Sequence, residues 1–400
     1  MMTRFIIKAL FLCSLMFSVA AFSQTRILTN RNSADLEKRV DFILQKITQN
    51  QFKEAEEETN RLIKDYPDFR LGQLIKGDLT MMRTRQIAPF SGNGRYSERE
   101  KEGLRTEAIA RLQASKDKIP ENYLPLNFLK ISTSIPYIIA VDTGKSRLYL
   151  IEQKPNGDTK IVLNYYMSIG KGGDSKQREG DNKTPVGIYN VISYIPKEKL
   201  PDYYGAGAFP LNYPNAWDKR NKRDGYGIWI HGSPSSTWSR PPLASEGCVV
   251  LPNADFSTLK PYVNVGKTPV LIASRIDWVP KDQLVKQREQ FMNALDQWRL
   301  DFQSLNMDKY LSHYSSNFNT NGQNYASWSV SKRKINASKT WITLNLENIT
   351  LLQDPGKEGV MFVSFDQDYK SSNLSNQMRK TQYWVLENGQ WKIIYEGSAQ

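Results

Sequence analysis

The spacing of apolar residues changes twice along the chain, and this change limits the folds that the chain can adopt. From Ser33 to about Lys116, apart from a loop at 86–100, apolar residues recur every three or four positions, as in amphipathic helices. From Pro136 onward they fall in short alternating runs separated by turns, as in β-strands. Helices and then strands follow residue 283. We therefore expect an α+β multidomain protein, with a helical region over 24–130, a β-rich domain over 136–276 and an α+β domain over 283–400.

The helical stretch begins at Ser33, which is placed to cap the first helix. The segment from Gln51 to Pro67 resembles one tetratricopeptide-like helical hairpin, but no second copy follows at a fixed period. A plain helical bundle is therefore the alternative. The amphipathic helices could pair two copies of the chain or bind another protein, so a homodimer and a protein partner both stay open.

The first 23 residues have the features of an export signal. Arg4 and Lys8 precede an apolar stretch from Ala9 to Phe22, and a small-x-small cleavage pattern ends at Ser23. The stretch is shorter than the ~20 apolar residues that cross a bilayer. We expect a signal peptide at 1–23 and a periplasmic protein. The alternative is an uncleaved signal that tethers the chain to the membrane.

The formal net charge of +13 favours an anionic partner. Export argues against nucleic acid, so we expect no nucleic-acid partner. An acidic wall polymer and an anionic lipid are compatible with the charge, and so is a basic surface that only keeps the protein in solution.

Cys248 is the one cysteine left after the predicted signal is removed, because Cys13 lies inside that signal. A single thiol in an exported protein has no internal disulfide partner. Nucleophilic catalysis would explain it, and this chemistry requires a base close to the thiol. The chain has only two histidines, and His231 follows a predicted strand that ends at Ile230. Each residue taken alone is compatible with a structural role, since free cysteine behaves as a small hydrophobic residue.

Two glycines could complete such a site. Because no Asp or Asn lies next to His231 in sequence, the backbone carbonyl of Gly232 is the simplest group to orient its ring. Gly247 would let the chain turn sharply, so that the amides of Gly247 and Cys248 face the oxyanion. No second Cys or His lies at metal-ligand spacing, and we expect neither a metal nor a cofactor.

These residues resemble the signature of a known family. Ile230-His231-Gly232 and Ser245-x-Gly247-Cys248 are similar to the motif of the L,D-transpeptidase catalytic domain (YkuD type). Gly180-Asp181-x-x-Thr184-Pro185-x-Gly187 resembles its second characteristic stretch, and the resemblance covers about residues 136–276. It implies a β-rich sandwich whose cysteine attacks the bond between meso-diaminopimelate and D-Ala in a peptidoglycan tetrapeptide stem.

The resemblance also assigns roles by position. It makes Cys248 the nucleophile that forms an acyl-enzyme, His231 the base, and the carbonyl of Gly232 the third member. Substrate contacts are expected from the residues around them, with further aromatic contacts open to Trp217 and Trp238. The expected substrate-binding residues are Ser245, Glu246, Thr184 and Trp229.

Two positions depart from the family pattern. Glu246 stands where the family often has His or Arg, and Val250 stands where it often has Arg. A carboxylate beside the oxyanion hole would raise the pKa of the thiol or repel an acidic stem peptide. The preference for substrate and acceptor is therefore open.

The group that resolves the acyl-enzyme decides the reaction. The motif favours a transpeptidase, in which the amine of a neighbouring stem attacks and a crosslink forms. The alternative is an L,D-carboxypeptidase, in which water attacks and the tetrapeptide becomes a tripeptide. Further alternatives are an amidase that releases wall-linked protein and a non-catalytic wall-binding protein, which Glu246 favours. Peptidoglycan stem peptides are the expected partner in each case.

The C-terminal stretch resembles the cone-shaped nuclear-transport-factor-2-like fold. The resemblance rests on Asp308 to Tyr314 and on Gln390 to Ile393, and Asn388-Gly389 predicts a tight hairpin between two strands. The complete three-part plan resembles that of wall-trimming L,D-carboxypeptidases that govern cell shape in helical bacteria. The ligand of this domain is not predicted.

Overall fold

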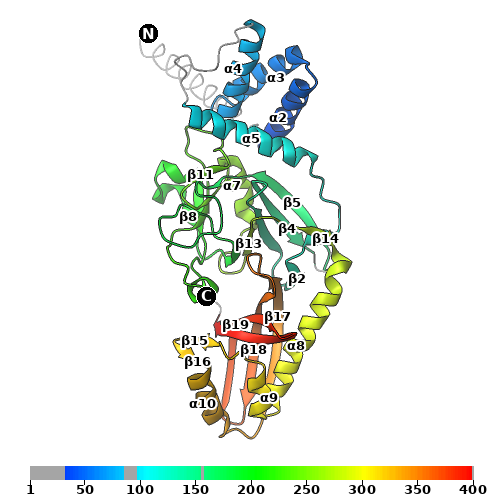
Figure 1. The fold of residues 1–400 in the computed structure, drawn as a ribbon, viewed down its shortest axis with the longest axis vertical. Helices are drawn as coiled ribbons and strands as arrows, with labels where there is room; N and C mark the ends of the chain where they lie inside the picture. Colours follow the sequence, from blue (N-terminus) through cyan, green and yellow to red (C-terminus); the bar gives the residue numbers. More distant parts are fainter. Residues whose placement is uncertain (1–31, 85–96, 155–156, 399–400) are drawn as a thin grey trace, which may run out of the picture.

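The computed structural model describes residues 32–84, 97–154 and 157–398 (Figure 1). The predicted signal peptide at 1–23 lies outside the described residues. The structure is elongated, with a helical region at one end, a β-rich domain in the middle and an α+β domain at the other end. This order confirms the predicted fold class. Within the described ranges, no helix is long and apolar enough to cross a membrane.

Four helices form the described part of the N-terminal region. The first is capped by Asn32, whose side chain accepts a hydrogen bond from the amide of Asp35 at 2.7 Å, so the predicted cap at Ser33 is wrong by one residue. The apolar faces of the helices enclose a core of their own, to which Trp238 of the middle domain contributes its ring. The helices are α2 (Ser33–Thr48), α3 (Phe52–Asp65), α4 (Arg70–Thr84) and α5 (Glu98–Lys116).

The middle domain packs two main sheets face to face. Apolar side chains from both sheets, among them Ile139, Leu148, Phe209 and Ile230, share one buried core, as in a sandwich. The larger sheet has the order β5 (Thr159–Tyr166), β4 (Arg147–Gln153), β3 (Tyr137–Asp142), β13 (Pro269–Ala273) and β7 (Gly187–Asn190). The smaller sheet has the order β12 (Val249–Val250), β10 (Trp229–His231), β9 (Gly207–Pro210) and β8 (Ile195–Pro196).

Shorter elements surround these sheets. The pair β6 (Ile169–Gly170) and β11 (Leu243–Ser245) is parallel and lies beside the smaller sheet. The helical elements of this domain are α6 (Ala216–Arg220), α7 (Asn253–Leu259), η1 (Lys197–Lys199), η2 (Asp202–Tyr204) and η3 (Lys260–Tyr262).

The C-terminal domain is a curved antiparallel sheet covered by helices. Asn388 and Gly389 both have positive φ angles, 50° and 78°, and join the last two strands in the predicted hairpin. The strands are β17 (Ile342–Gln353), β18 (Val360–Ser371), β19 (Leu374–Glu387) and β20 (Gln390–Ser398). The other elements are η4 (Lys281–Leu284), α8 (Val285–Gln303), α9 (Met307–Ser312), β15 (Asn319–Thr320), β16 (Gln323–Asn324) and α10 (Tyr325–Asn336).

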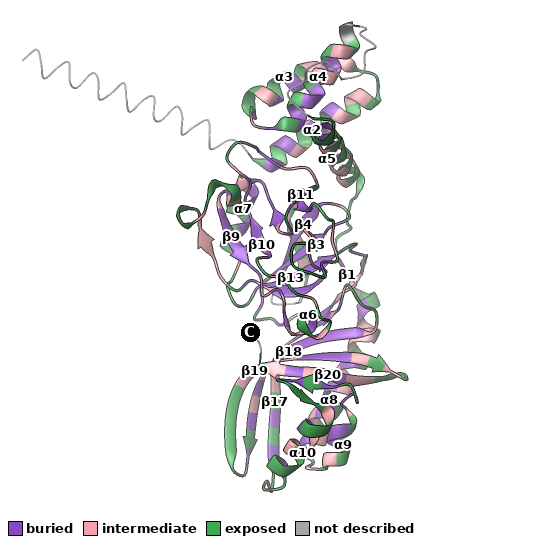
Figure 2. Ribbon diagram, turned by 60° about the vertical axis from the view of Figure 1, so that its left-hand side comes forward, coloured by how far each residue is buried: buried purple, intermediate pink, exposed green. Residues whose placement is uncertain are grey.

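Two short strands between the helical region and the middle domain join distant parts of the chain. β1 (Tyr123–Pro125) pairs with β14 (Trp278–Pro280), and β2 (Phe128–Lys130) pairs with β17 at the edge of the C-terminal sheet. Both fall within the range predicted as helical. The middle and C-terminal domains also share one hydrophobic cluster, which contains Leu271 of the first and Trp384 of the second. Figure 2 shows buried residues running through both domains.

Candidate active site

Sheet pairing brings the predicted nucleophile and base to one face of the smaller sheet. β10 and β12 are parallel, with Ile230 opposite Val249 and His231 opposite Val250. Extending this register by one residue sets Cys248 opposite Trp229. Side chains alternate between faces along a strand, and residues in register share a face. The side chains of Cys248 and His231 therefore emerge on the same side of the sheet.

The ring of His231 is fully buried and held by one backbone carbonyl. Its Nδ1 lies 2.7 Å from the carbonyl oxygen of Gly232, so Nδ1 carries the proton that is donated. Nε2 has no hydrogen-bond partner among the described residues and is left as an acceptor. Burial lowers the pKa of His231 to about 4, although the hydrogen bond to Gly232 opposes this shift. The imidazole is thus neutral near pH 7 and can act as a base.

Close packing explains the glycine at position 232. A Cβ there would lie 2.2 Å from Oδ1 of Asn253 and 2.6 Å from the amide nitrogen of Ala206. The amide of Gly232 donates to the carbonyl of Tyr204 at 3.1 Å. This packing fixes the position of the carbonyl that accepts the hydrogen bond from His231.

Cys248 is half-buried, and its Sγ donates to the carbonyl of Gly227 at 3.3 Å. Burial raises the pKa of the Cys248 thiol to about 11, and the nearby carboxylate of Glu246 adds to the rise. The thiol therefore keeps its proton near pH 7. Attack on a carbonyl requires a base that removes this proton during the reaction.

The turn before the cysteine is fixed by side-chain hydroxyls. Gly247 has a φ angle of +126°, and a Cβ there would lie 2.8 Å from the carbonyl oxygen of Lys183. The hydroxyl of Ser245 accepts from the amide of Gly247 at 3.1 Å and donates to the carbonyl of Cys248 at 2.7 Å. The hydroxyl of Thr184 donates to the carbonyl of Gly247 at 2.9 Å and accepts from the amide of Gly170 at 3.0 Å.

These contacts correct two predictions. The amide of Gly247 is engaged by Ser245, so its predicted role as an oxyanion donor is wrong; the amide of Cys248 has no acceptor in the part of the chain that the structure describes. The predicted substrate contacts of Ser245 and Thr184 are also wrong, because both side chains are fully buried behind the turn. They position the backbone around Gly247 instead.

Glu246 and Trp229 lie where a substrate could reach them. The side chain of Glu246 is 73% exposed, and its carboxylate lies 3.7 Å from the ammonium of Lys171, which partly offsets its charge. Trp229 is half-buried, and its ring lies 4.8 Å from that of Tyr204.

Three residues at the site were not predicted from the sequence. The ring of Tyr204 meets that of His231 edge to face at 5.0 Å, and the ring of Tyr203 lies 5.9 Å from His231. The guanidinium of Arg240 lies 4.4 Å from the centre of the Tyr203 ring and donates to its hydroxyl at 3.3 Å. Tyr203-Tyr204-Gly205 is the only local signal, and an aromatic pair before a glycine is equally typical of a core.

Comparisons with known proteins agree with this geometry. Residues 136–272 match the L,D-transpeptidase catalytic domain (YkuD), and residues 290–397 match the Cds6 C-terminal NTF2-like domain. The solved structure of Bd1075 from Bdellovibrio bacteriovorus is 31% identical, with a TM-score of 0.61; the alignment covers 69% of this chain and 98% of Bd1075. The chain belongs to the YkuD-type L,D-transpeptidase family. It is therefore a peptidoglycan-modifying enzyme of that family.

A second solved structure shares the fold over nearly its whole length. The helical cell shape determining protein Pgp2 from Campylobacter jejuni is 24% identical, with a TM-score of 0.57. The alignment covers 72% of this chain and 99% of Pgp2. No curated protein matches the chain.

Proposed function

We propose that this family member is an L,D-carboxypeptidase that removes the terminal D-Ala from peptidoglycan tetrapeptide stems. The observation that carries the proposal is the guanidinium of Arg240, which lies over Tyr203 beside the buried base His231. Arg240 has no carboxylate partner among the described residues. It is therefore free to bind the carboxylate of the terminal D-Ala.

In the first half-reaction, Nε2 of His231 takes the thiol proton as Sγ of Cys248 attacks the carbonyl of the diaminopimelate residue. The amide of Cys248 donates to the oxyanion of the tetrahedral intermediate. The protonated His231 then gives its proton to the amine of the leaving D-Ala. The C–N bond breaks, and a thioester between Cys248 and the tripeptide remains.

In the second half-reaction, water resolves the thioester. His231 removes a proton from water, and the oxygen attacks the thioester carbonyl. The C–S bond breaks, the proton returns from His231 to Sγ, and the tripeptide leaves with a free carboxylate. Because His231 is neutral at rest, it is ready to take a proton at the start of both half-reactions.

The charge beside His231 favours water over an amine. The acceptor for crosslinking is an ammonium near pH 7, and it would have to approach the base next to the guanidinium of Arg240. Like charges that approach each other in a partly buried site repel, so the guanidinium disfavours the ammonium there. Water meets no such barrier.

Crosslinking transpeptidation is the second candidate, and the exposed carboxylate of Glu246 favours it because it could attract the ammonium of an acceptor stem. The ammonium of Lys171 offsets part of this attraction. The likeness to a helical cell shape determining protein covers 72% of this chain and supports a role in shaping the wall. We propose that the enzyme acts on the wall in the periplasm after loss of residues 1–23.

Purified tetrapeptide muropeptides test the proposal. We expect wild-type protein to release D-Ala and leave only tripeptide in mass analysis, whereas C248A gives neither product. New dimers in place of tripeptide would show a transpeptidase. R240Q should raise KM for the tetrapeptide roughly tenfold or more, because a charged hydrogen bond to the terminal carboxylate is worth about 1.5–3 kcal/mol.

The matched control is R275Q, since Arg275 is 74% exposed and pairs with Asp277 at the surface. Its KM should equal that of the wild type. Folded wild-type protein that forms neither tripeptide nor dimers would contradict both reactions. In that case, release of wall-linked protein and simple wall binding are the functions left to assay.

A further inference from the structure

Two oppositely charged side chains flank the turn that carries the nucleophile. Glu246 lies two residues before Cys248, and Lys171 directly follows β6. The carboxylate of Glu246 and the ammonium of Lys171 are 3.7 Å apart, and the two side chains are 73% and 43% exposed, respectively. An exposed ion pair of this kind is weak, because water screens both charges. A ligand with charges of its own can therefore separate the two groups easily.

The backbone beneath both side chains is fixed. β6 and β11 are parallel, with Gly170 opposite Ser245, and the amide of Lys171 donates to the carbonyl of Ser245 at 2.7 Å. A Cβ at Gly170 would lie 3.1 Å from Cα of Gly247, so the two chain segments are in close contact. A carboxylate and an ammonium are thus anchored beside the nucleophile, and only the ends of their side chains can move.

Glu246 is an accessible acid beside the thiol. Burial raises the pKa of the Cys248 thiol most, and the carboxylate of Glu246 raises it further. The charges of Arg240 and Lys176 oppose this rise. Lys176 is buried, and its ammonium lies 2.7 Å from the carboxylate of Asp181, so a ligand cannot reach it. Arg240 is assigned to the terminal carboxylate of the substrate. A ligand at the thiol therefore still has the charge of Glu246 to meet.

The substrate of the proposed reaction carries a matching pair of charges. The side chain of meso-diaminopimelate ends in a D-centre that has one ammonium and one carboxylate. A chain of about five C–C bonds joins this D-centre to the scissile carbonyl and spans about 6 Å. Glu246 and Cys248 are two residues apart in sequence, and two extended residues span at most about 7 Å. The D-centre of a stem held at the thiol can therefore reach the ion pair.

We propose that Glu246 and Lys171 are a specificity-determining pair that binds the D-centre of diaminopimelate in the stem being cleaved. Glu246 accepts a hydrogen bond from its ammonium, and Lys171 donates one to its carboxylate. The proposal rests on the proposed function for the identity of the substrate. It assigns Glu246 to the donor stem and not to an acceptor stem, which again leaves water to resolve the thioester. A stem with lysine in place of diaminopimelate has no carboxylate for Lys171.

Hydrolysis of three tetrapeptide muropeptides tests the proposal. They contain diaminopimelate, diaminopimelate amidated at the D-centre carboxyl, or lysine. For wild-type protein we expect KM to be about tenfold higher when the carboxylate is amidated or absent, because a hydrogen bond between charged groups is lost, and kcat to change little. K171Q should raise KM for diaminopimelate by the same factor and should not distinguish it from its amidated form. E246Q should raise KM for all three, because all three carry the ammonium.

The control variants are K145Q and D117N, which each remove one charge from another exposed ion pair, whose side chains are 39% and 45% exposed. Both should keep the wild-type KM for every substrate. Equal KM values of the wild type for diaminopimelate and its amidated form would overturn the proposal, and so would a K171Q variant that still distinguishes them. Dimer formation that falls in E246Q while KM for the donor is unchanged would assign Glu246 to the acceptor and would overturn it too.

Binding to C248A separates this proposal from the proposed reaction. The Kd of C248A for the same muropeptides does not depend on turnover, and we expect it to show the same preference of about tenfold, which K171Q in the C248A background should abolish. Wild-type protein that forms no product, together with this preference in C248A, would contradict the reaction and support the ion pair. Tripeptide formed from all three substrates, with equal Kd and equal KM, would support the reaction and overturn the ion pair.

Discussion

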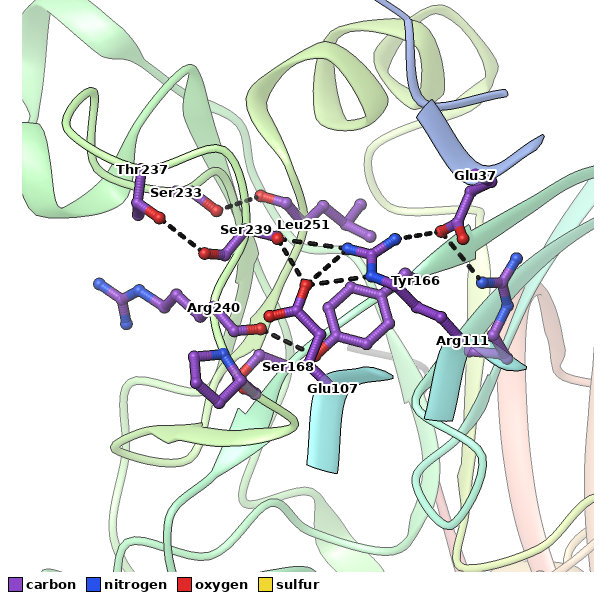
Figure 3. A network of polar contacts seen from close by, with 12 residues as sticks. Glu37, Glu107, Arg111, Tyr166, Ser168, Ser233, Thr237, Ser239, Arg240 and Leu251 are labelled. Atoms are coloured by element: carbon purple, nitrogen blue, oxygen red, sulfur yellow. Dashed lines mark hydrogen bonds and ion pairs between the residues drawn. The ribbon is translucent and has the colours of Figure 1, made fainter. Parts of the chain in front are cut away.

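The catalytic domain meets its two neighbours through aromatic contacts in both cases, but only the interface with the helical region adds a network of buried charges among the described residues. Toward the C-terminal domain the contact is apolar and aromatic, and the ring of Trp217 stacks on that of Tyr383 at 5.0 Å within one shared core. Toward the helical region the contact contains a buried network of charges around Arg111 (Figure 3). An apolar contact stabilises wherever surfaces fit, whereas a buried charge network is favourable in one arrangement only. The first interface therefore holds the domains together, and the second fixes their orientation.

Hydrogen bonds connect the charge network to Ser239 and hold the backbone carbonyl of Arg240 in the next position of the same loop. Arg111 lies 2.8 Å from Glu107 and 2.5 Å from Glu37, and the hydroxyl of Ser239 donates to Glu107 at 2.8 Å. Figure 3 shows the hydroxyl of Tyr166 directed at the backbone carbonyl of Arg240, to which it donates at 2.8 Å. The helical region thus orients the loop that carries the guanidinium beside His231.

The largest effect on stability should come from the apolar interface. W217A removes a buried ring and leaves a cavity, so we expect the free energy of unfolding to fall by about 4 kcal/mol in urea denaturation. W341A is the matched control, because Trp341 is 49% exposed, and it should change the free energy by about 0.5 kcal/mol or less. Equal losses in the two variants would show that the stack is not what joins the domains.

Removing only the cation of the charge network should have the second largest effect on the free energy of unfolding. R111A leaves Glu107 buried without its cation, and we expect a loss of about 3 kcal/mol, at the low end of such cases because Ser239 still donates to the carboxylate. A loss below 1 kcal/mol, as for an exposed pair, would mean that the network is solvated in solution. R105A serves as the control, since Arg105 and Glu102 form an exposed pair on the same helix.

The polar interface should also respond to pH through Asp255. This residue is buried in α7 near Glu37 and Arg111, and burial raises the pKa of its carboxyl to about 7. Between pH 4 and pH 7 the folded protein therefore keeps a proton that the unfolded chain has lost, so stability falls as pH rises. We expect a fall of roughly 2 kcal/mol between pH 5 and pH 6.5.

The measurement for Asp255 is the difference between wild type and D255N in urea denaturation at these two pH values. Taking the difference removes the contribution of other titrating groups, including His231. Parallel pH dependence in the two proteins would show that Asp255 ionises normally.

Replacing both charges should have the smallest effect on stability. E107L together with R111M exchanges a buried ion pair for apolar side chains of similar size, and we expect a change within about 1 kcal/mol. If the network serves orientation, KM for tetrapeptide should still rise, because the loop with Arg240 loses part of its support. Unchanged KM and unchanged stability would assign no role to the network.

Much of the fold follows from local pattern. The Asn388-Gly389 hairpin depends on neighbours in sequence and is found in the structure. The change from helices to strands is also found, but it comes before Tyr123 and not at Pro136, because β1 and β2 pair with distant strands. The approach of Cys248 and His231 was predicted from a motif whose spacing reflects two adjacent strands. The spacing of the motif indicates that the two residues are close because His231 ends β10 and Cys248 directly precedes the neighbouring strand β12.

The features of the site that the sequence did not indicate depend on contacts between segments that are far apart in the chain. Trp217 and Trp238 were considered as substrate contacts, but they pack against the C-terminal and helical domains, respectively. The engagement of the Gly247 amide by Ser245 depends on the detailed shape of one turn. Arg240 reaches the site through a cation–π contact with Tyr203, 37 residues away, and no local pattern predicts such a partner.

The short pairing of β2 with β17 has a consequence for how the protein can be made. The edge of the last sheet is completed by a strand that is synthesised before the catalytic domain, and the pairing there sets Lys130 opposite Leu351 and Phe128 opposite Leu352. The sheet of the C-terminal domain is therefore complete only when a segment that precedes the catalytic domain has paired with it. A fragment that starts at residue 283 would carry an unpaired β17 edge and would tend to aggregate.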